Sequence, residues 1–153
     1  MRNAEIVRVF KHIAALLELK RESRFKIRAY QQAALSLKEF PDDLTGMVRE
    51  GRLREVPGVG EALATKITEL VTTGQLRYYE NLKAEFPAGI VALLDVPGIG
   101  PKTAEMLNRE LGIISVDELE AALDSGRLAA LPHIREKTVD HIRHGIQTLR
   151  QRE

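Results

Sequence analysis

The sequence has no cysteine and no tryptophan, and aromatic residues make up only 5% of its 153 residues. Without cysteine the chain can form neither a disulfide scaffold nor a thiolate metal site, which fits a reducing cytoplasm. Its apolar runs, such as Ile13–Leu17, are far too short to span a bilayer, and its first residues do not resemble a signal peptide. We therefore expect a cytoplasmic protein with no membrane partner.

The sequence also lacks a large excess of charge of either sign. Its formal net charge is only +1, so the bulk charge does not indicate a nucleic-acid partner. The distribution is uneven, because residues 1–88 hold 15 basic and 12 acidic side chains whereas residues 89–153 hold 8 and 10. The segment Lys20–Arg28 carries five basic residues and one acidic residue. Such a patch fits either a phosphate-binding surface or an ordinary solvated helix face.

Apolar residues recur with helical spacing along the whole chain, and no segment shows the two-residue alternation of a strand. Leu63–Val71 forms one such stripe, which Gly74 is placed to end, and Ser115-Val116-Asp117-Glu118 has the pattern of a capping box. We predict an all-α chain. Pro87 and Gly89 interrupt the helical pattern, so we place the boundary between two small helical subdomains there, at residues 1–87 and 88–153.

Two tandem glycine hairpins dominate the sequence. Val56-Pro57-Gly58-Val59-Gly60 recurs 40 residues later as Val96-Pro97-Gly98-Ile99-Gly100, and a helical pattern follows each copy. Glycine allows a ligand to approach the backbone closely, and the unpaired N–H groups at a helix start can hold an anion. A site made of backbone can hold a phosphate without reading a base. One copy would fit a simple helix–helix turn, but the repetition favours two phosphate sites.

A third, degenerate copy lies near the C-terminus. Gly126-Arg127-Leu128 precedes Leu131-Pro132-His133-Ile134-Arg135, as Gly51-Arg52-Leu53 precedes the first hairpin. His133 and Arg135 replace the two glycines. We expect this third hairpin to serve as a packing turn.

These hairpins are helix-hairpin-helix motifs, and their arrangement resembles the N-terminal part of family X DNA polymerases over nearly the whole chain. The match extends to Phe25-Lys26-Ile27-Arg28-Ala29-Tyr30 and to Thr73-Gly74-Gln75-Leu76-Arg77. The resemblance implies a lyase-type domain at residues 1–87 and a thumb- or fingers-like domain at residues 88–153. It also implies a monomer that binds gapped, nicked or 5′-phosphorylated duplex DNA in repair, associated with the nucleoid in a bacterium.

The resemblance further implies which residues meet the DNA, with Lys26 and Tyr30 in a pocket for a 5′-phosphate. The expected DNA-binding residues are Lys26, Tyr30, Arg54, Gly58, Val59, Gly60, Gly98, Ile99, Gly100, Lys102 and Thr103. No cofactor is required for binding, but the family's hairpins hold a monovalent cation, Na⁺ or K⁺, through backbone carbonyls. By position these carbonyls belong to Arg54, Val56, Val59, Leu94, Val96 and Ile99.

Lys66 stands where animal members of the family have a lysine that forms a Schiff base with a 5′-deoxyribose phosphate. The attacking amine must be deprotonated, which positive charge from Lys26 or Arg54 would favour. The family's phosphate-contacting lysine, its acid before the nucleophile and its basic residue after Arg77 are replaced by Ala62, Thr65 and Tyr78. Lys66 is therefore either a lyase nucleophile or a solvated helix lysine.

Three functions remain open from the sequence: a DNA-binding module, a lyase, and a helical protein-interaction domain. Polymerisation in this family needs clustered metal-binding carboxylates, and the acidic residues here are scattered, so this chain cannot polymerise DNA on its own. His141 and His144 share a helix face, but without a third ligand we interpret them as a surface pair rather than a zinc site.

Overall fold

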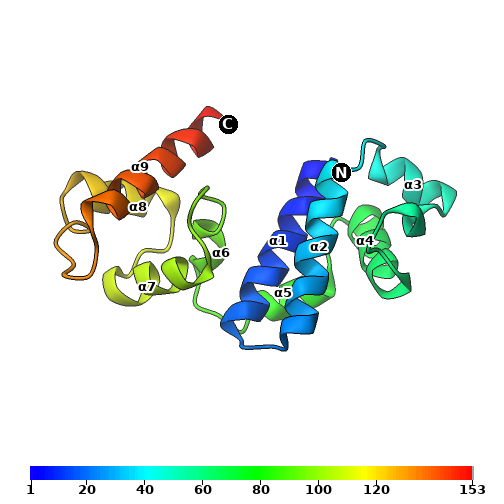
Figure 1. The fold of residues 1–153 in the computed structure, drawn as a ribbon, viewed down its shortest axis with the longest axis horizontal. Helices are drawn as coiled ribbons and strands as arrows, with labels where there is room; N and C mark the ends of the chain where they lie inside the picture. Colours follow the sequence, from blue (N-terminus) through cyan, green and yellow to red (C-terminus); the bar gives the residue numbers. More distant parts are fainter. Residues whose placement is uncertain (153) are drawn as a thin grey trace. The chain divides into compact units, whose positions relative to one another are not determined.

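The computed structural model describes residues 1–152, in which every regular element is a helix (Figure 1). This confirms the prediction of an all-α chain. The chain divides into two compact units, Met1–Glu85 and Phe86–Glu153. Among the described residues, no helix is both long and apolar enough to cross a membrane.

The first unit is built on a pair of long helices that lie side by side (Figure 1). Its elements are α1 (Asn3–Leu19), α2 (Arg24–Glu39), α3 (Leu44–Glu50), the 3-10 helix η1 (Leu53–Glu55), α4 (Glu61–Thr73) and α5 (Arg77–Lys83). The stripe expected from the sequence is buried, since Ile6, Phe10 and Ile13 on α1 have no exposed surface. Burial of such side chains contributes about 1.5–3 kcal/mol each.

Polar residues fix where the helices of the first unit begin and end. The Ser23 side chain caps α2 by accepting from the Lys26 N–H, and the Asp43 carboxylate caps α3 by accepting from the Thr45 N–H. Gly74 ends α4 in the left-handed conformation, at φ 81°, as its place in the sequence predicted. These caps set the lengths of the helices that carry the candidate site.

A buried hydrogen bond ties α5 to α1. His12 Nδ1 lies 2.7 Å from the Tyr79 hydroxyl, and His12 is the buried polar residue of the core among the described residues. An unpaired polar group there would cost about 1–3 kcal/mol, so the bond specifies how α5 docks. The neighbouring Tyr78 is thereby held at the surface of the first unit.

The second unit contains four helices, α6 (Ile90–Leu93), α7 (Pro101–Leu111), α8 (Val116–Asp124) and α9 (Glu136–Gln151). Ser115 caps α8 by accepting from the Glu118 N–H at 3.1 Å, as the capping-box pattern predicted. The Glu118 carboxylate accepts from the Ile114 N–H, one residue before the expected partner. The reciprocal half of the box is thus shifted by one residue.

Two glycines of the second unit allow segments to approach so closely that no side chain would fit. A Cβ on Gly89 would lie 2.3 Å from the Cα of Ile114. A Cβ on Gly145, in α9, would lie 2.2 Å from the Pro97 carbonyl oxygen. The backbone of α9 therefore rests directly on the second hairpin.

Candidate nucleic-acid interface

The two glycine hairpins have nearly the same backbone. In each, the N–H of the fourth residue donates to the carbonyl of the first residue at 3.0 Å. The third residue has positive φ, 81° at Gly58 and 89° at Gly98, as a type II turn requires. The apolar residues between the glycines, Val59 and Ile99, are buried and anchor the turns. The sequence repeat is therefore also a structural repeat.

Each hairpin ends in a glycine that begins the next helix. Gly60 and Gly100 have φ −91° and −90°, and neither α4 nor α7 has a side-chain cap. A Cβ added at either glycine would meet nothing within 4 Å, so the space in front of both helix starts is open. The first N–H groups of a helix have no partner within it, and the helix dipole adds positive potential there. Both hairpins can therefore hold an anion.

The third hairpin differs at the residue that replaces the first glycine. The Ile134 N–H closes the turn at 3.1 Å, and Arg135 begins α9 with φ −91°, much as in the other two copies. His133, however, does not have positive φ, so the central peptide of this turn is oriented differently. Its Nε2 lies 2.9 Å from the Glu110 carboxylate of α7. This hairpin therefore contacts its own unit.

Lys26 and Lys66 converge on a single aromatic ring in the first unit. Their Nζ atoms lie 5.5 Å and 5.0 Å from the centre of the Tyr78 ring. The Tyr78 ring in turn stacks on Tyr30, with 6.0 Å between the centroids and 4° between the planes. Helices α2, α4 and α5 thus bring together the three expected residues Lys26, Tyr30 and Lys66. The fourth member is Tyr78, which replaces a basic residue of the family.

The electrostatics of this cluster favour an anion. Burial, and then the neighbouring Tyr78, raise the pKa of the Tyr30 hydroxyl, so this group stays neutral at physiological pH. Lys26 and Lys66 are half-buried, so both side chains keep some contact with solvent. Two cations beside one ring, with no charge on the Tyr30 beneath it, form a site of suitable charge for a phosphate.

The other expected residues lie beside the hairpins. Arg54 is exposed on η1, and Lys102 is exposed in the first turn of α7 with the half-buried Thr103 next to it. Arg54 is not among the cations over the Tyr78 ring. His141 and His144 are both exposed on α9, and within residues 1–152 no group of three histidine or acidic side chains could hold a metal ion.

Two aromatic residues at this site are absent from the expected DNA-binding residues. Tyr78 was noted only as the replacement of a basic residue, and that replacement was a signal that this position faces the pocket. Phe25, between Arg24 and Lys26, is 86% exposed. An aromatic residue inside a basic segment was visible in the sequence, but its exposure depends on how α2 packs.

Comparison with known proteins agrees with this geometry. Residues 1–76 match the family described as a helix-hairpin-helix domain, and residues 90–148 match the SAM-like helix-hairpin-helix tandem family. The chain is a helix-hairpin-helix protein. It is also 30% identical over 142 residues to the DNA polymerase/3′-5′ exonuclease PolX of Bacillus subtilis (strain 168), which covers 93% of this chain and 24% of that protein.

A second relative is more distant. DNA polymerase lambda of Arabidopsis thaliana is 28% identical over 103 residues, which covers 67% of this chain and 19% of that protein. These matches confirm the predicted homology to family X DNA polymerases. The chain spans about a quarter or less of the length of these relatives.

Proposed function

We propose that this helix-hairpin-helix protein binds duplex DNA through backbone phosphates, without reading the base sequence. The observation that carries the proposal is the repeated pair of open, uncapped helix starts at Gly60 and Gly100. Each would hold one phosphate on neutral backbone groups, and the exposed Arg54 and Lys102 would add longer-range attraction. The names of the two relatives, both DNA polymerases, support this function.

A salt titration tests the proposal against a protein-interaction domain. We expect fluorescence anisotropy to detect duplex binding that weakens as salt rises. The logarithm of the association constant should fall linearly with the logarithm of the salt concentration, with a slope of about −0.9 for each phosphate neutralised. Duplexes of unrelated sequence should bind equally. Binding that is insensitive to salt, or no binding to any duplex, would contradict the proposal.

We further propose that the preferred DNA is gapped or nicked and carries a 5′-phosphate, as in repair. The support is that Lys26 and Lys66 meet over Tyr78 while Phe25, adjacent to Lys26, is almost fully exposed. The two ammonium groups would bind the 5′-phosphate. An exposed aromatic ring beside cations is suited to stacking on an unpaired base, an interaction of about 1–3 kcal/mol.

The absence of tryptophan makes this preference directly measurable. A Phe25→Trp variant has a single tryptophan, whose fluorescence should be quenched by gapped DNA with unpaired template bases and much less by intact duplex. Leu35→Trp is the matched reporter, since Leu35 lies on the same helix and is 56% exposed. Equal responses of the two reporters, or equal quenching by intact and gapped DNA, would rule out the stacking role.

A second candidate function is a 5′-deoxyribose-phosphate lyase with Lys66 as nucleophile. The observation in its favour is that the half-buried Lys66 lies close to the same ring as Lys26. The uncharged amine would attack the C1′ aldehyde and lose water to form an imine. Removal of a C2′ proton would then break the C3′–O bond and leave a 5′-phosphate on the DNA.

Borohydride trapping tests the lyase. Reduction of the imine on an incised abasic duplex should give a covalent adduct that Lys66→Ala abolishes. Lys83→Ala is the matched control, because Lys83 also lies over a tyrosine ring, that of Tyr79, at 4.4 Å. Absence of an adduct with the wild type, or equal trapping by the Lys66 variant, would exclude this activity while leaving DNA binding intact.

We also propose that each hairpin binds Na⁺ or K⁺ through backbone carbonyls. The oxygens of Arg54, Val56 and Val59 come from η1 and the turn that directly follows it, and oxygen is the ligand that such hard cations prefer. The Val56 carbonyl also accepts the turn hydrogen bond, which uses one of its two lone pairs. Replacing K⁺ by tetramethylammonium at constant ionic strength should weaken duplex binding, and unchanged affinity would contradict the cation's role.

A further inference from the structure

A histidine of α9 lies directly on the turn of the second hairpin. A Cβ built on Gly98 would be 3.1 Å from Cδ2 and 3.6 Å from Nε2 of His141. One turn further along α9, Gly145 packs against Pro97 so closely that a Cβ would not fit, so α9 contacts this hairpin at both positions. The imidazole therefore lies beside the turn that leads into the proposed phosphate site at the start of α7.

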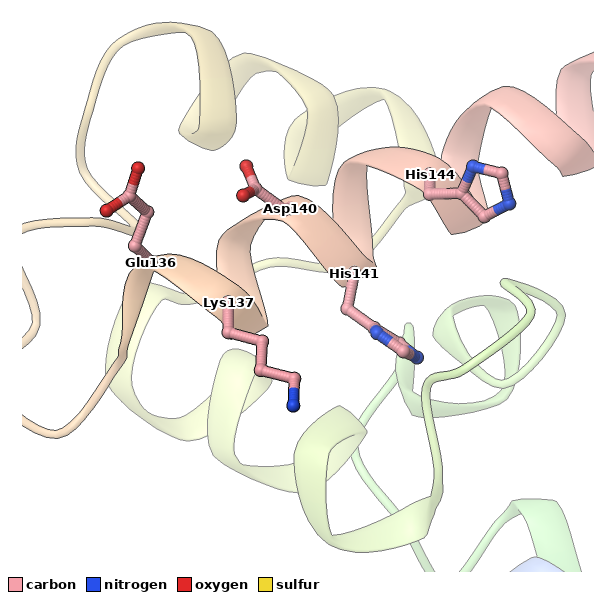
Figure 2. Close-up of a pocket in the computed structure, with 5 residues that line it drawn as sticks. All are labelled: Glu136, Lys137, Asp140, His141 and His144. Carbon is pink, nitrogen blue, oxygen red and sulfur yellow. The ribbon is translucent and has the colours of Figure 1, made fainter.

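The side chains around His141 leave α9 in different directions. An open surface pocket of about 470 Å³ is lined by Glu136, Lys137, Asp140, His141 and His144, all of them exposed residues of α9. Figure 2 shows that Lys137 and His141 leave the same side of the helix, toward α7 and the second hairpin, as expected for residues four apart. Glu136 and Asp140 point the other way in this view, although they line the same pocket (Figure 2). The two side chains that point toward the hairpin are thus both hydrogen-bond donors.

The first hairpin has no equivalent neighbour. A Cβ on Gly58 would meet nothing within 4 Å, whereas the same atom on Gly98 meets the His141 ring. The two hairpins therefore share a backbone but differ in the side chains around it. This difference cannot come from the turn itself, because the φ values of the two glycines are nearly the same.

We propose that Lys137 and His141 complete the phosphate site of the second hairpin. The ligand is the phosphodiester backbone of DNA: the hairpin N–H groups bind a phosphate from one side, and the imidazole and ammonium groups donate to the backbone from the side of α9. This inference rests on the proposed DNA binding. The third hairpin then has a structural role, because this turn begins α9 and so directs Lys137 and His141 toward the second hairpin.

Single substitutions give the first test, with duplex affinity measured by anisotropy and folding checked by circular dichroism. His141→Ala and Lys137→Ala should each weaken binding by about five-fold, the effect of losing one typical hydrogen bond. His141→Arg should retain affinity. His144→Ala is the matched control, because it removes a histidine of the same helix and the same pocket. This variant should leave affinity unchanged.

A double-variant comparison assigns the effect to the second hairpin. Gly100→Asp places a carboxylate at the start of α7, so in that background His141→Ala should have little further effect. In the Gly60→Asp background, where the second hairpin is intact, the full five-fold loss should remain. Three results would overturn the inference: equal losses in both backgrounds, a loss equal to that of His144→Ala, or a gain in affinity on removing His141. In each of these cases, binding by the wild type would still support the proposed function. Absence of wild-type binding would overturn both.

Discussion

At the scale of single residues, Tyr78 determines how Lys26 and Lys66 are held. Both ammonium groups lie within 5.5 Å of its ring centre, and each such contact contributes about 0.5–1 kcal/mol at an exposed site. Lys26 and Lys66 come from different helices, so the shared ring fixes the distance between two positive charges. A phosphate bound there would meet an arrangement already formed in the free protein.

We predict that Tyr78→Leu removes most of the advantage of a 5′-phosphate in DNA binding, because the lysines lose their common support. Tyr78→Phe keeps the ring and should keep that advantage. The measurement is the ratio of affinities for a gapped duplex with 5′-phosphate and the same duplex with 5′-hydroxyl. A general loss of folding would lower both affinities, whereas a positioning role changes their ratio. An unchanged ratio in the leucine variant would count against this role.

A second prediction at this scale concerns Tyr30 and the stability of the protein at alkaline pH. Burial raises the pKa of its hydroxyl above the ordinary value of about 10. The unfolded chain therefore loses this proton more readily than the folded chain, so the stabilisation is fully present below pH 10 and declines as the pH rises above it. Tyr30→Phe should show a smaller loss of stability between pH 9 and about 11 in urea titrations. Parallel losses in both proteins would refute the assignment to Tyr30.

At the scale of elements, the contact between α9 and the second hairpin leaves no room for a side chain. Gly145 is buried, and its added Cβ would lie 2.2 Å from the Pro97 oxygen, a distance that no side-chain movement can relieve. The helix start at Glu136 and the turn at Pro97 must therefore keep their relative positions for the candidate site to exist.

We predict that Gly145→Ala destabilises the protein by about 1–3 kcal/mol or more, the usual cost of forcing an extra group into a packed site. Gly46→Ala is the control with the opposite sign. The nearest atoms to its Cβ are at 3.8 Å, so alanine in α3 should stabilise by about 0.5–1 kcal/mol. Thermal melts of both variants test the pair. A Gly145 variant as stable as the wild type would show that α9 does not rest on this hairpin.

Local patterns within elements could be predicted from the sequence, whereas contacts between elements could not. The apolar stripes, the Gly74 helix end and the two hairpins are local patterns, so spacing alone revealed them. The meeting of Lys26, Lys66 and Tyr78 depends on the packing of three helices, and that of Gly98 and His141 joins residues 43 positions apart. Periodicity shows which face of a helix is buried but not which neighbour buries it.

At the scale of the whole molecule, each of the two units contains one intact hairpin. Two modest phosphate sites on one chain can give useful affinity, because the second contact forms within an already bound complex. Such binding suits a partner whose backbone repeats regularly and whose sequence varies. If the proposed function holds, loss of one hairpin should weaken binding, and loss of both should weaken it further.

The most direct test of the central claim replaces the helix-start glycines by aspartate. An aspartate at this position accepts hydrogen bonds from the first N–H groups of the helix, so it stabilises α4 or α7 while it occupies and repels the phosphate site. Ser115→Asp, at a helix start outside the hairpins, controls for the added charge.

The measurement is duplex affinity by anisotropy for Gly60→Asp, Gly100→Asp and the double variant, with thermal stability recorded for each. We predict a loss of about ten-fold for each single variant, a larger loss for the double variant, and stability equal to or above the wild type. Ser115→Asp should bind like the wild type. A folded double variant that binds duplex DNA with wild-type affinity would contradict the account.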